Sequence, residues 1–302
     1  MTGRRLAWRC AQLLLPTFLL SLFGLAYLAP STGPEASACS PPQPCPCASS
    51  TPAPAENNGS NGHRLCLLVP FRDRFEELQV FLPHMAAFLA AQKLDYRLLV
   101  LNQLDLYRFN RASLINAGWY EAQRLACDYL AMHDVDLLPV NPGLAYAWPG
   151  EGIAYHVASP DYHPRYNYTK FIGGILILTL ADYKAVNGMS NRYWGWGLED
   201  DEFYLRLRDG GISLRRPTDL STNRSNTFYH LHDRRLRKRD TFRIGDQKQV
   251  SRRRDRMSGL DNVEYEVLSR TKLAVEGAEA SVVNIRLHCN LSFSPWCQLP
   301  SS

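Results

Sequence analysis

The chain has 302 residues, of which 45% are hydrophobic and 21% are charged. This is the composition of an ordinary globular protein, and the length accommodates one large domain or two small ones with appendages. The formal net charge of +5 is modest, so composition gives no reason to expect a nucleic-acid partner.

The N-terminus predicts a membrane anchor. Three arginines lie within the first nine residues, and an apolar, uncharged run follows over residues 10–29. About twenty apolar residues span a bilayer as a helix, and positive charge on the short side keeps that side cytoplasmic. We expect a cytoplasmic tail at 1–9, a transmembrane signal anchor at 10–29 and a lumenal remainder, which is single-pass type II topology. The alternative is a signal peptide that is cleaved near the small residues at 26–29.

A linker and a lumenal domain follow. Residues 30–62 are rich in Pro and Ser and cannot bury a core, so they predict a stem. Residues 63–302 then form the folded lumenal domain. Its cysteines are compatible with disulfides, and Cys289 and Cys297 are close enough in sequence for a small loop, although spacing does not establish pairing. Sequons for N-glycosylation occur at Asn58, Asn167, Asn223 and Asn290.

Strand and helix patterns alternate from His63 onward. Short apolar runs predict strands at 65–69, 96–101, 153–158, 171–179, 263–268 and 282–287. Helical spacing predicts helices at 76–92, 113–129, 182–187 and 199–208. This alternation predicts an α/β fold in which helices flank a mixed, mainly parallel sheet. Ligands of such sheets usually bind beyond the carboxyl ends of the strands.

Two pairs of polar residues are candidate metal ligands. Asp134 and Asp136 flank one apolar residue, and alternate side chains of an extended segment point the same way. His230 and His232 have the same spacing. Oxygen plus imidazole ligands suit manganese better than magnesium or calcium, and zinc is the alternative, although no cysteine joins the cluster. Each pair alone is weak, because Asp-x-Asp arises by chance and paired histidines are commonly surface residues.

The segment Trp194–Glu202 combines indoles, glycines and acids. Indole faces stack on sugars, and glycines allow a ligand to approach the backbone closely. One carboxylate of the cluster Glu199-Asp200-Asp201-Glu202 could serve as a general base toward a sugar hydroxyl. The competing interpretation is that acids in a first helical turn stabilise the helix through its dipole.

Arginines follow the first strand and precede the second helix. Arg72 and Arg74 lie just after the first apolar run, and Arg111 follows Phe109-Asn110. Guanidinium groups at such positions can hold diphosphate oxygens. Taken one at a time, each is better explained as a surface arginine.

Together these motifs resemble the β-1,4-galactosyltransferase family over residues 64–297. The resemblance rests on Pro70-Phe71-Arg72-Asp73-Arg74, Phe109-Asn110-Arg111, Asp134-Val135-Asp136, Phe171-Ile172-Gly173-Gly174, Asn187-Gly188-Met189-Ser190-Asn191 and Trp194-Gly195-Trp196-Gly197-Leu198-Glu199-Asp200-Asp201. It implies a nucleotide-sugar transferase fold of the GT-A type, UDP-galactose as donor, Mn²⁺ as metal and a Golgi membrane location.

The resemblance also implies residue roles. The metal ligands would be Asp136, His230 and His232. The donor would contact Phe71, Arg72, Arg74, Phe109, Arg111, Asp134 and Trp196. The acceptor would contact Tyr166, Tyr168, Trp196, Glu199 and Asp200. Asp200 would be the catalytic base, with Glu199 beside it holding the sugars.

His230-Leu231-His232-Asp233 and the Tyr166/Tyr168 pair are similar to the branch of the family whose acceptor is xylose. The implied reaction is an inverting transfer of galactose to the 4-hydroxyl of xylose on proteoglycan core proteins, which builds the glycosaminoglycan linker. The alternatives are transfer of galactose or N-acetylgalactosamine to N-acetylglucosamine, and a catalytically silent lumenal sugar-binding protein. A glycosidase with paired acids is disfavoured by the arginines and the metal cluster.

Several positions depart from the family pattern or stay open. Phe171 stands where the family usually has a tyrosine that helps select galactose, and Leu198 stands where near relatives have an arginine. We still expect galactose. A glycan on Asn167 would obstruct the xylose site, so we expect Asn167 to be unmodified in active enzyme. The basic segment 234–256 is interpreted as a loop that closes over the donor, as a contact for acidic glycans or membranes, or as a solvated loop.

Overall fold

The computed structural model describes residues 62–233 and 235–299, all within one compact unit, Pro54–Ser302. The predicted tail, the anchor and all but Gly62 of the predicted stem lie outside the described residues. In the part of the chain that is described, no helix is both long enough and apolar enough to cross a membrane.

The centre of the fold is a mixed sheet with the order β7-β5-β6-β3-β1-β2-β10-β9. Its strands are β1 (Arg64–Phe71), β2 (Asp95–Gln103), β3 (Tyr129–His133), β5 (Ile153–His156), β6 (Ile175–Thr179), β7 (Ser213–Arg215), β9 (Tyr265–Val275) and β10 (Ala278–Leu287). Strands β3, β1, β2 and β10 run parallel, whereas β6 is antiparallel to β3 and β9 is antiparallel to β10. The predicted α/β class is confirmed, with three antiparallel pairings in the sheet.

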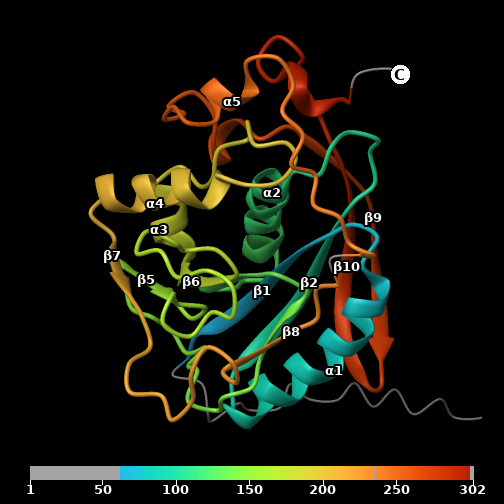
Figure 1. The fold of residues 1–302 in the computed structure, drawn as a ribbon. Helices are drawn as coiled ribbons and strands as arrows, with labels where there is room; N and C mark the ends of the chain where they lie inside the picture. The colour runs from blue at the N-terminus through green and yellow to red at the C-terminus, as the bar shows by residue number, and fades with distance from the viewer. Residues whose placement is uncertain (1–61, 234, 300–302) are drawn as a thin grey trace, which may run out of the picture. The chain divides into compact units, whose positions relative to one another are not determined.

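Helices cover both faces of this sheet (Figure 1). Residues of β1 alternate between two cores, with Cys66 and Leu68 on one face and Leu65 and Leu67 on the other. On the first face lie α2 (Arg111–Arg124), α3 (Leu180–Ala185) and α4 (Glu199–Asp209), and on the second lies α1 (Phe75–Ala91). A strand buried on both faces is a continuous apolar run, which is why this strand was visible in the sequence.

The second helix is shorter than predicted. We expected it to continue to residue 129, but α2 ends at Arg124 and β3 begins at Tyr129. Ala126 adopts a left-handed conformation with φ of 52°, which stops the helix. Cys127 then forms a disulfide with Cys66 of β1. The chain is therefore held beside β1, and the apolar residues after Ala126 belong to a strand.

The sequence analysis missed β3, β7 and two further short strands. Strand β4 (Leu137–Pro139) pairs antiparallel with β8 (Phe228–His230) in a separate small sheet. The remaining elements are short: α5 (Gln247–Val250), η1 (Leu260–Asn262) and η2 (Pro295–Cys297). The predicted small loop at the C-terminus is confirmed, because Cys289 and Cys297 form a disulfide.

Candidate active site

The predicted site residues gather at the carboxyl edge of the central strands. Asp134 follows β3 directly, and its backbone N–H donates to the carbonyl of Gly174, just before the antiparallel β6. Arg111 opens α2, whose preceding residue Asn110 caps the helix by accepting a hydrogen bond from Ser113 N–H. Loops from three separate parts of the chain therefore meet at one edge, as expected for an α/β sheet.

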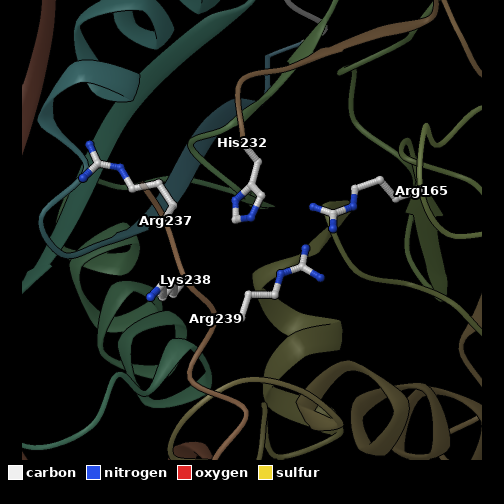
Figure 2. A pocket seen from close by; sticks show the side chains of 5 residues that line it. All are labelled: Arg165, His232, Arg237, Lys238 and Arg239. Atoms are coloured by element: carbon white, nitrogen blue, oxygen red, sulfur yellow. The ribbon is translucent and has the colours of Figure 1, made fainter. Parts of the chain in front are cut away.

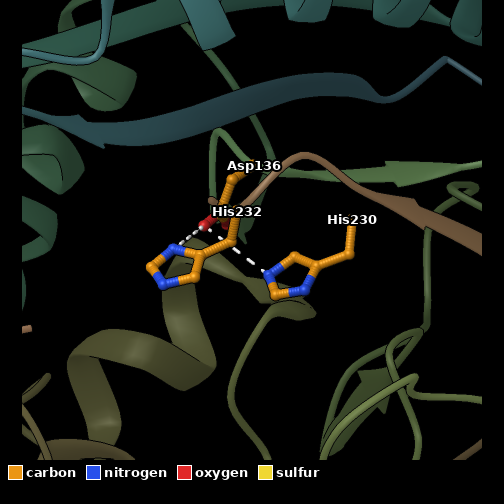
Figure 3. A group of neighbouring side chains, drawn as sticks. All are labelled: Asp136, His230 and His232. Carbon is orange, nitrogen blue, oxygen red and sulfur yellow. Dashed lines mark hydrogen bonds and ion pairs between the residues drawn. The ribbon is translucent and has the colours of Figure 1, made fainter. Parts of the chain in front are cut away.

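The small sheet β4–β8 assembles the metal cluster. Leu137 pairs with His230 across the two strands, and Leu231 N–H donates to the carbonyl of Asp136 at 2.8 Å. This register places Asp136 Oδ2 at 3.6 Å from His230 Nε2 and at 3.2 Å from His232 Nδ1 (Figure 3). The two imidazole rings lie nearly parallel, at an interplanar angle of 9°.

These three residues fit a manganese ion. One ligand atom from each of Asp136, His230 and His232 lies within 4.8 Å of the other two. Burial alone would raise the pKa of Asp136, but the hydrogen bond to His230 and the neighbouring positive charges lower it, so the carboxylate is ionised. One oxygen and two imidazole nitrogens form a donor set that suits manganese. The predicted metal triad is confirmed as a cluster.

An arginine holds the first aspartate of the Asp-x-Asp segment. Arg111 Nε donates to Asp134 Oδ1 at 2.9 Å. Burial opposes the charged form of Arg111, but Asp134, Glu199 and Asp200 outweigh it and raise the pKa of the guanidinium. Burial raises the pKa of Asp134, against the effect of Arg111. Arg111 is thus a permanent cation between the metal side of the site and the acids of α4.

Glu199 and Asp200 occupy the first turn of α4. The helix starts from Leu198, which has a left-handed φ of 78°. Burial, followed by the charges of Glu199 and Asp201, raises the pKa of Asp200 to about 8. Burial also raises the pKa of Glu199, whose Oε2 atom is buried and has no protein partner. A carboxylate with a raised pKa and an unsatisfied buried oxygen are both typical of a catalytic or ligand-binding position.

Three aromatic side chains form a wall beside these acids. The rings of Tyr166 and Tyr168 lie 6.5 Å apart, and Phe171 contacts both, at centroid distances of 4.8 and 5.5 Å. Burial, followed by the charges of Asp200 and Asp201, raises the pKa of the Tyr168 hydroxyl. Asn167, between the two tyrosines, is exposed and hence accessible to glycosylation. That it is unmodified in active enzyme stays a prediction.

Trp196 faces this wall across an arginine that the sequence analysis did not single out. The guanidinium of Arg239 lies 4.6 Å from the Trp196 ring centroid, and its Nη1 donates to Tyr166 Oη at 2.7 Å. A cavity of about 350 Å³ lies beside this contact. Figure 2 shows its lining side chains, which are Arg165, His232, Arg237, Lys238 and Arg239. The cavity is therefore cationic and borders one metal ligand.

An ion pair between the buried Arg108 and the partly exposed Asp240 fixes the segment that carries Arg239. Arg108 Nε and Nη2 donate to the two oxygens of Asp240 at 2.6 and 2.9 Å, and Nη2 also donates to the Phe242 carbonyl. Trp196 N–H donates to the Asp240 carbonyl at 2.8 Å. Asp240 is the one acid within the basic residues 234–245. A lone acid in such a segment is the sequence signal that could have predicted this ion pair. We call this set of contacts among Arg108, Asp240 and Trp196 the tryptophan clamp.

The contacts of the remaining predicted donor-binding residues are with other parts of the protein, and they do not by themselves indicate a donor site. Phe71 ends β1 with its side chain in the apolar core. Arg72 donates to the carbonyls of Gln103, Asp105 and Tyr107, and its guanidinium lies 5.9 Å from the Phe109 ring centroid. Arg74 Nη1 lies 3.4 Å from Glu77 Oε1. The donor roles of these residues stay predictions.

A mixed α/β sheet with a metal triad, an arginine-held Asp-x-Asp segment and half-buried acids at one edge defines a glycosyltransferase of the GT-A type. Residues 50–148 match the family described as the N-terminal region of glycosyl transferase group 7, and residues 154–231 match the N-terminal domain of galactosyltransferase. The chain belongs to the β-1,4-galactosyltransferase family.

Two curated relatives illustrate this likeness. The chain is 55% identical to xylosylprotein 4-beta-galactosyltransferase of Caenorhabditis elegans, over 78% of this chain and 82% of the relative. It is 52% identical to human beta-1,4-galactosyltransferase 7, over 85% of this chain and 78% of the relative.

Solved structures show the same fold. The catalytic domain of Drosophila beta-1,4-galactosyltransferase 7, in complex with xylobiose, superposes with a TM-score of 0.77 at 49% identity, covering 78% of this chain and 99% of that one. A mutant of the same Drosophila protein, crystallised with manganese, UDP-Gal and xylobiose, has the same TM-score, identity and coverage.

Proposed function

We propose that the chain transfers galactose from UDP-galactose to the 4-hydroxyl of xylose on proteoglycan core proteins, with inversion at the anomeric carbon. The observation that carries this proposal is the meeting of the Asp136-His230-His232 cluster with the half-buried Asp200 at one edge of the sheet. Support comes from relatives at 49–55% identity, one of which was crystallised with manganese, UDP-Gal and xylobiose.

The geometry suits a single in-line displacement. Asp200 takes the proton from the xylose hydroxyl, because its pKa, raised to about 8, makes it a stronger base than an ordinary aspartate. Manganese held by the triad would stabilise the negative charge that develops on the leaving diphosphate. Arg111 supplies a fixed positive charge between the two sides of the site.

The acceptor sugar lies between aromatic surfaces in this proposal. Tyr166 and Tyr168 form one wall, and Trp196, 42% exposed, offers an indole face. The unsatisfied Oε2 atom of Glu199 can accept a hydrogen bond from a sugar hydroxyl. Flat apolar faces combined with a few carboxylates are a normal arrangement for sugar recognition.

The cellular setting is also part of the proposal. The arginines before the apolar run at 10–29 support a type II anchor in the Golgi membrane, with the catalytic domain in the lumen. A protease-protection assay on intact microsomes tests this, since residues 63–302 should resist added protease until detergent opens the vesicles.

The reaction is tested with the purified full-length chain, UDP-galactose, manganese and an aryl β-xyloside. An N-acetylglucosamine acceptor and UDP-N-acetylgalactosamine serve as parallel controls. We expect manganese-dependent galactosyl-xyloside as the sole product, with Phe171 and Leu198 tolerated. Product only on N-acetylglucosamine, or only from the other donor, would contradict the specificity and retain the family. Binding of UDP and manganese without any product would favour a sugar-binding protein.

A further inference from the structure

His163 lies in the loop before the aromatic wall, and its ring is buried, with 3% of the residue exposed. Its Nδ1 atom accepts two backbone hydrogen bonds, from Arg165 N–H and Tyr166 N–H, each 3.0 Å long. A nitrogen that accepts from two donors carries no proton itself, so the tautomer is fixed with any proton on Nε2. The imidazole therefore acts here as a template for the turn that leads into Tyr166.

The neighbours of the ring belong to the site. Its centroid lies 5.1 Å from Tyr166, 5.0 Å from Phe171 and 6.4 Å from the metal ligand His230. It also borders Gly174, where an added Cβ atom would approach His163 Cδ2 to 3.7 Å. One side of the ring thus supports the acceptor wall, and another faces the metal triad.

The loop that holds His163 is itself fixed. His163 N–H donates to the Ser159 carbonyl at 2.8 Å, and the His163 carbonyl accepts from Arg224 Nε at 2.9 Å. A buried histidine most often serves packing alone. Here, however, the side-chain nitrogen bonds to the backbone of an acceptor-wall residue, so a movement of the ring displaces that wall.

We propose that His163 is a positioning residue that sets the place of Tyr166 in the acceptor site, through the two hydrogen bonds accepted by Nδ1. This inference rests on the proposed function, since the acceptor is taken to bind at Tyr166. A consequence is that acceptor affinity depends on His163 more strongly than donor affinity does. Metal affinity depends on it less, because His163 contacts His230 by packing only.

Two substitutions separate the hydrogen-bonding role from packing. In His163→Asn, the amide oxygen lies at the same number of bonds from the backbone as Nδ1, so it can accept both N–H groups. In His163→Gln, the oxygen lies one bond further out and reaches the position of Nε2, so it cannot accept the two N–H groups that bond to Nδ1. Tyr129→Phe is the control, because it removes a buried hydrogen bond, to the Tyr146 carbonyl, at the start of β3, away from the site.

The experiment measures KM for the aryl β-xyloside, KM for UDP-galactose, kcat and the manganese half-saturation concentration with full-length chains. Calorimetric titration of the xyloside, in the presence of UDP and manganese, gives binding without turnover. Loss of two hydrogen bonds of ordinary strength predicts an increase of about tenfold in xyloside KM and Kd for His163→Gln. His163→Asn should stay within about twofold of wild type, and UDP-galactose KM should change little in either.

The possible outcomes distinguish failure of the His163 proposal from failure of the proposed function. Equal xyloside affinities for the Asn and Gln variants would overturn the proposal, as would proportional increases in the KM of both substrates or a pattern matching Tyr129→Phe. If the wild type binds the xyloside but does not galactosylate it, the proposed function fails and the Kd values still test His163. A wild type that neither binds nor galactosylates the xyloside contradicts both proposals.

Discussion

The acids at the start of α4 lower the stability of the fold when they are ionised. Asp200 is half-buried beside Glu199 and Asp201, and its pKa is raised to about 8 from an ordinary value of 3.8. Such a group destabilises the fold once it ionises. A raised pKa is nonetheless useful in a base that must accept a proton near neutral pH. In its proposed role as base, activity and stability therefore make opposite demands on Asp200.

Asp200→Asn should lose turnover and gain stability. General bases contribute about 10²- to 10⁴-fold in rate, so kcat should fall by that factor, while UDP binding is retained. Because the folded pKa of Asp200 is raised, its protonated form stabilises the fold at low pH, and that stability is lost as pH rises from about 4 through about 8. Asparagine does not titrate, so the free energy of unfolding of the variant should increase relative to that of the wild type as pH rises over this range.

Thermal melts at pH 5 and pH 8.5 measure this gain. We expect an advantage for Asp200→Asn that grows between the two pH values by about 1 kcal/mol or more, the equivalent of one pKa unit. An advantage independent of pH would contradict the raised pKa. Retention of turnover would contradict the role as base.

The metal triad makes a prediction at a single carboxylate. Asp136→Asn removes the one anionic ligand, so the manganese half-saturation concentration should rise by at least about tenfold. Asp233→Asn is the matched control, because Asp233 is exposed and its carboxylate accepts from Arg235 N–H. Manganese titration of activity, together with direct manganese binding, measures both. Equal shifts in the two variants would argue against Asp136 as a ligand.

At the scale of elements, the tryptophan clamp connects a loop to a segment forty-odd residues later. Gly195 makes the close approach feasible, since an added Cβ atom would lie only 2.1 Å from Arg108 Nη2. Gly195 N–H also donates to the Phe109 carbonyl. The position of the Trp196 backbone is therefore set by a glycine and a buried arginine rather than by the indole itself.

Gly195→Ala should break the clamp. The methyl group must displace Arg108, so we expect a loss of about 1–3 kcal/mol in stability and a higher KM for the acceptor. Gly211→Ala is the control for backbone strain, because Gly211 has a similar positive φ (72° against 82°) but nothing within 4 Å of an added Cβ atom. Similar melting temperatures and KM values in the two variants would show that the close approach is unimportant.

Sequence patterns predicted the long elements and missed the short ones. The strand at 65–69 and the helix at 76–92 were evident, because burial on both faces and helical periodicity leave clear signatures. The three-residue strands β4 and β8 are too short for any periodicity. Asp136, His230 and His232 were selected by residue type and family likeness, and only the pairing of β4 with β8 shows why they meet. The contacts of Arg239 and His163 depend on tertiary geometry that no spacing encodes.

At the scale of the whole molecule, one disulfide ties the centre of the sheet together. Cys66 lies within β1, and Cys127 lies 61 residues later, just before the adjacent β3. Both sulfur atoms are buried in the core on the α2 face. The pairing closes a long loop, whereas Cys289 and Cys297 have a sequence separation of only 8.

Replacing both Cys66 and Cys127 by alanine should lower the free energy of unfolding by about 4 kcal/mol, from loop-closure entropy alone. The corresponding change at Cys289 and Cys297 should cost about 2–3 kcal/mol. Denaturant unfolding of the two double variants measures the difference. A larger loss from the C-terminal pair would show that local packing, rather than loop length, controls the effect.

The β9–β10 hairpin has a practical consequence. Because β10 runs parallel to β2, the exposed turn at Glu276 and Gly277 lies at the amino edge of the parallel strands, opposite the edge that carries the acids and the metal triad. A peptide tag, a fluorophore or an immobilisation linker inserted there would be attached as far along the strands from the substrates as the sheet allows. The hairpin therefore offers a handle by which the enzyme can be held on a surface and still be supplied with both sugars.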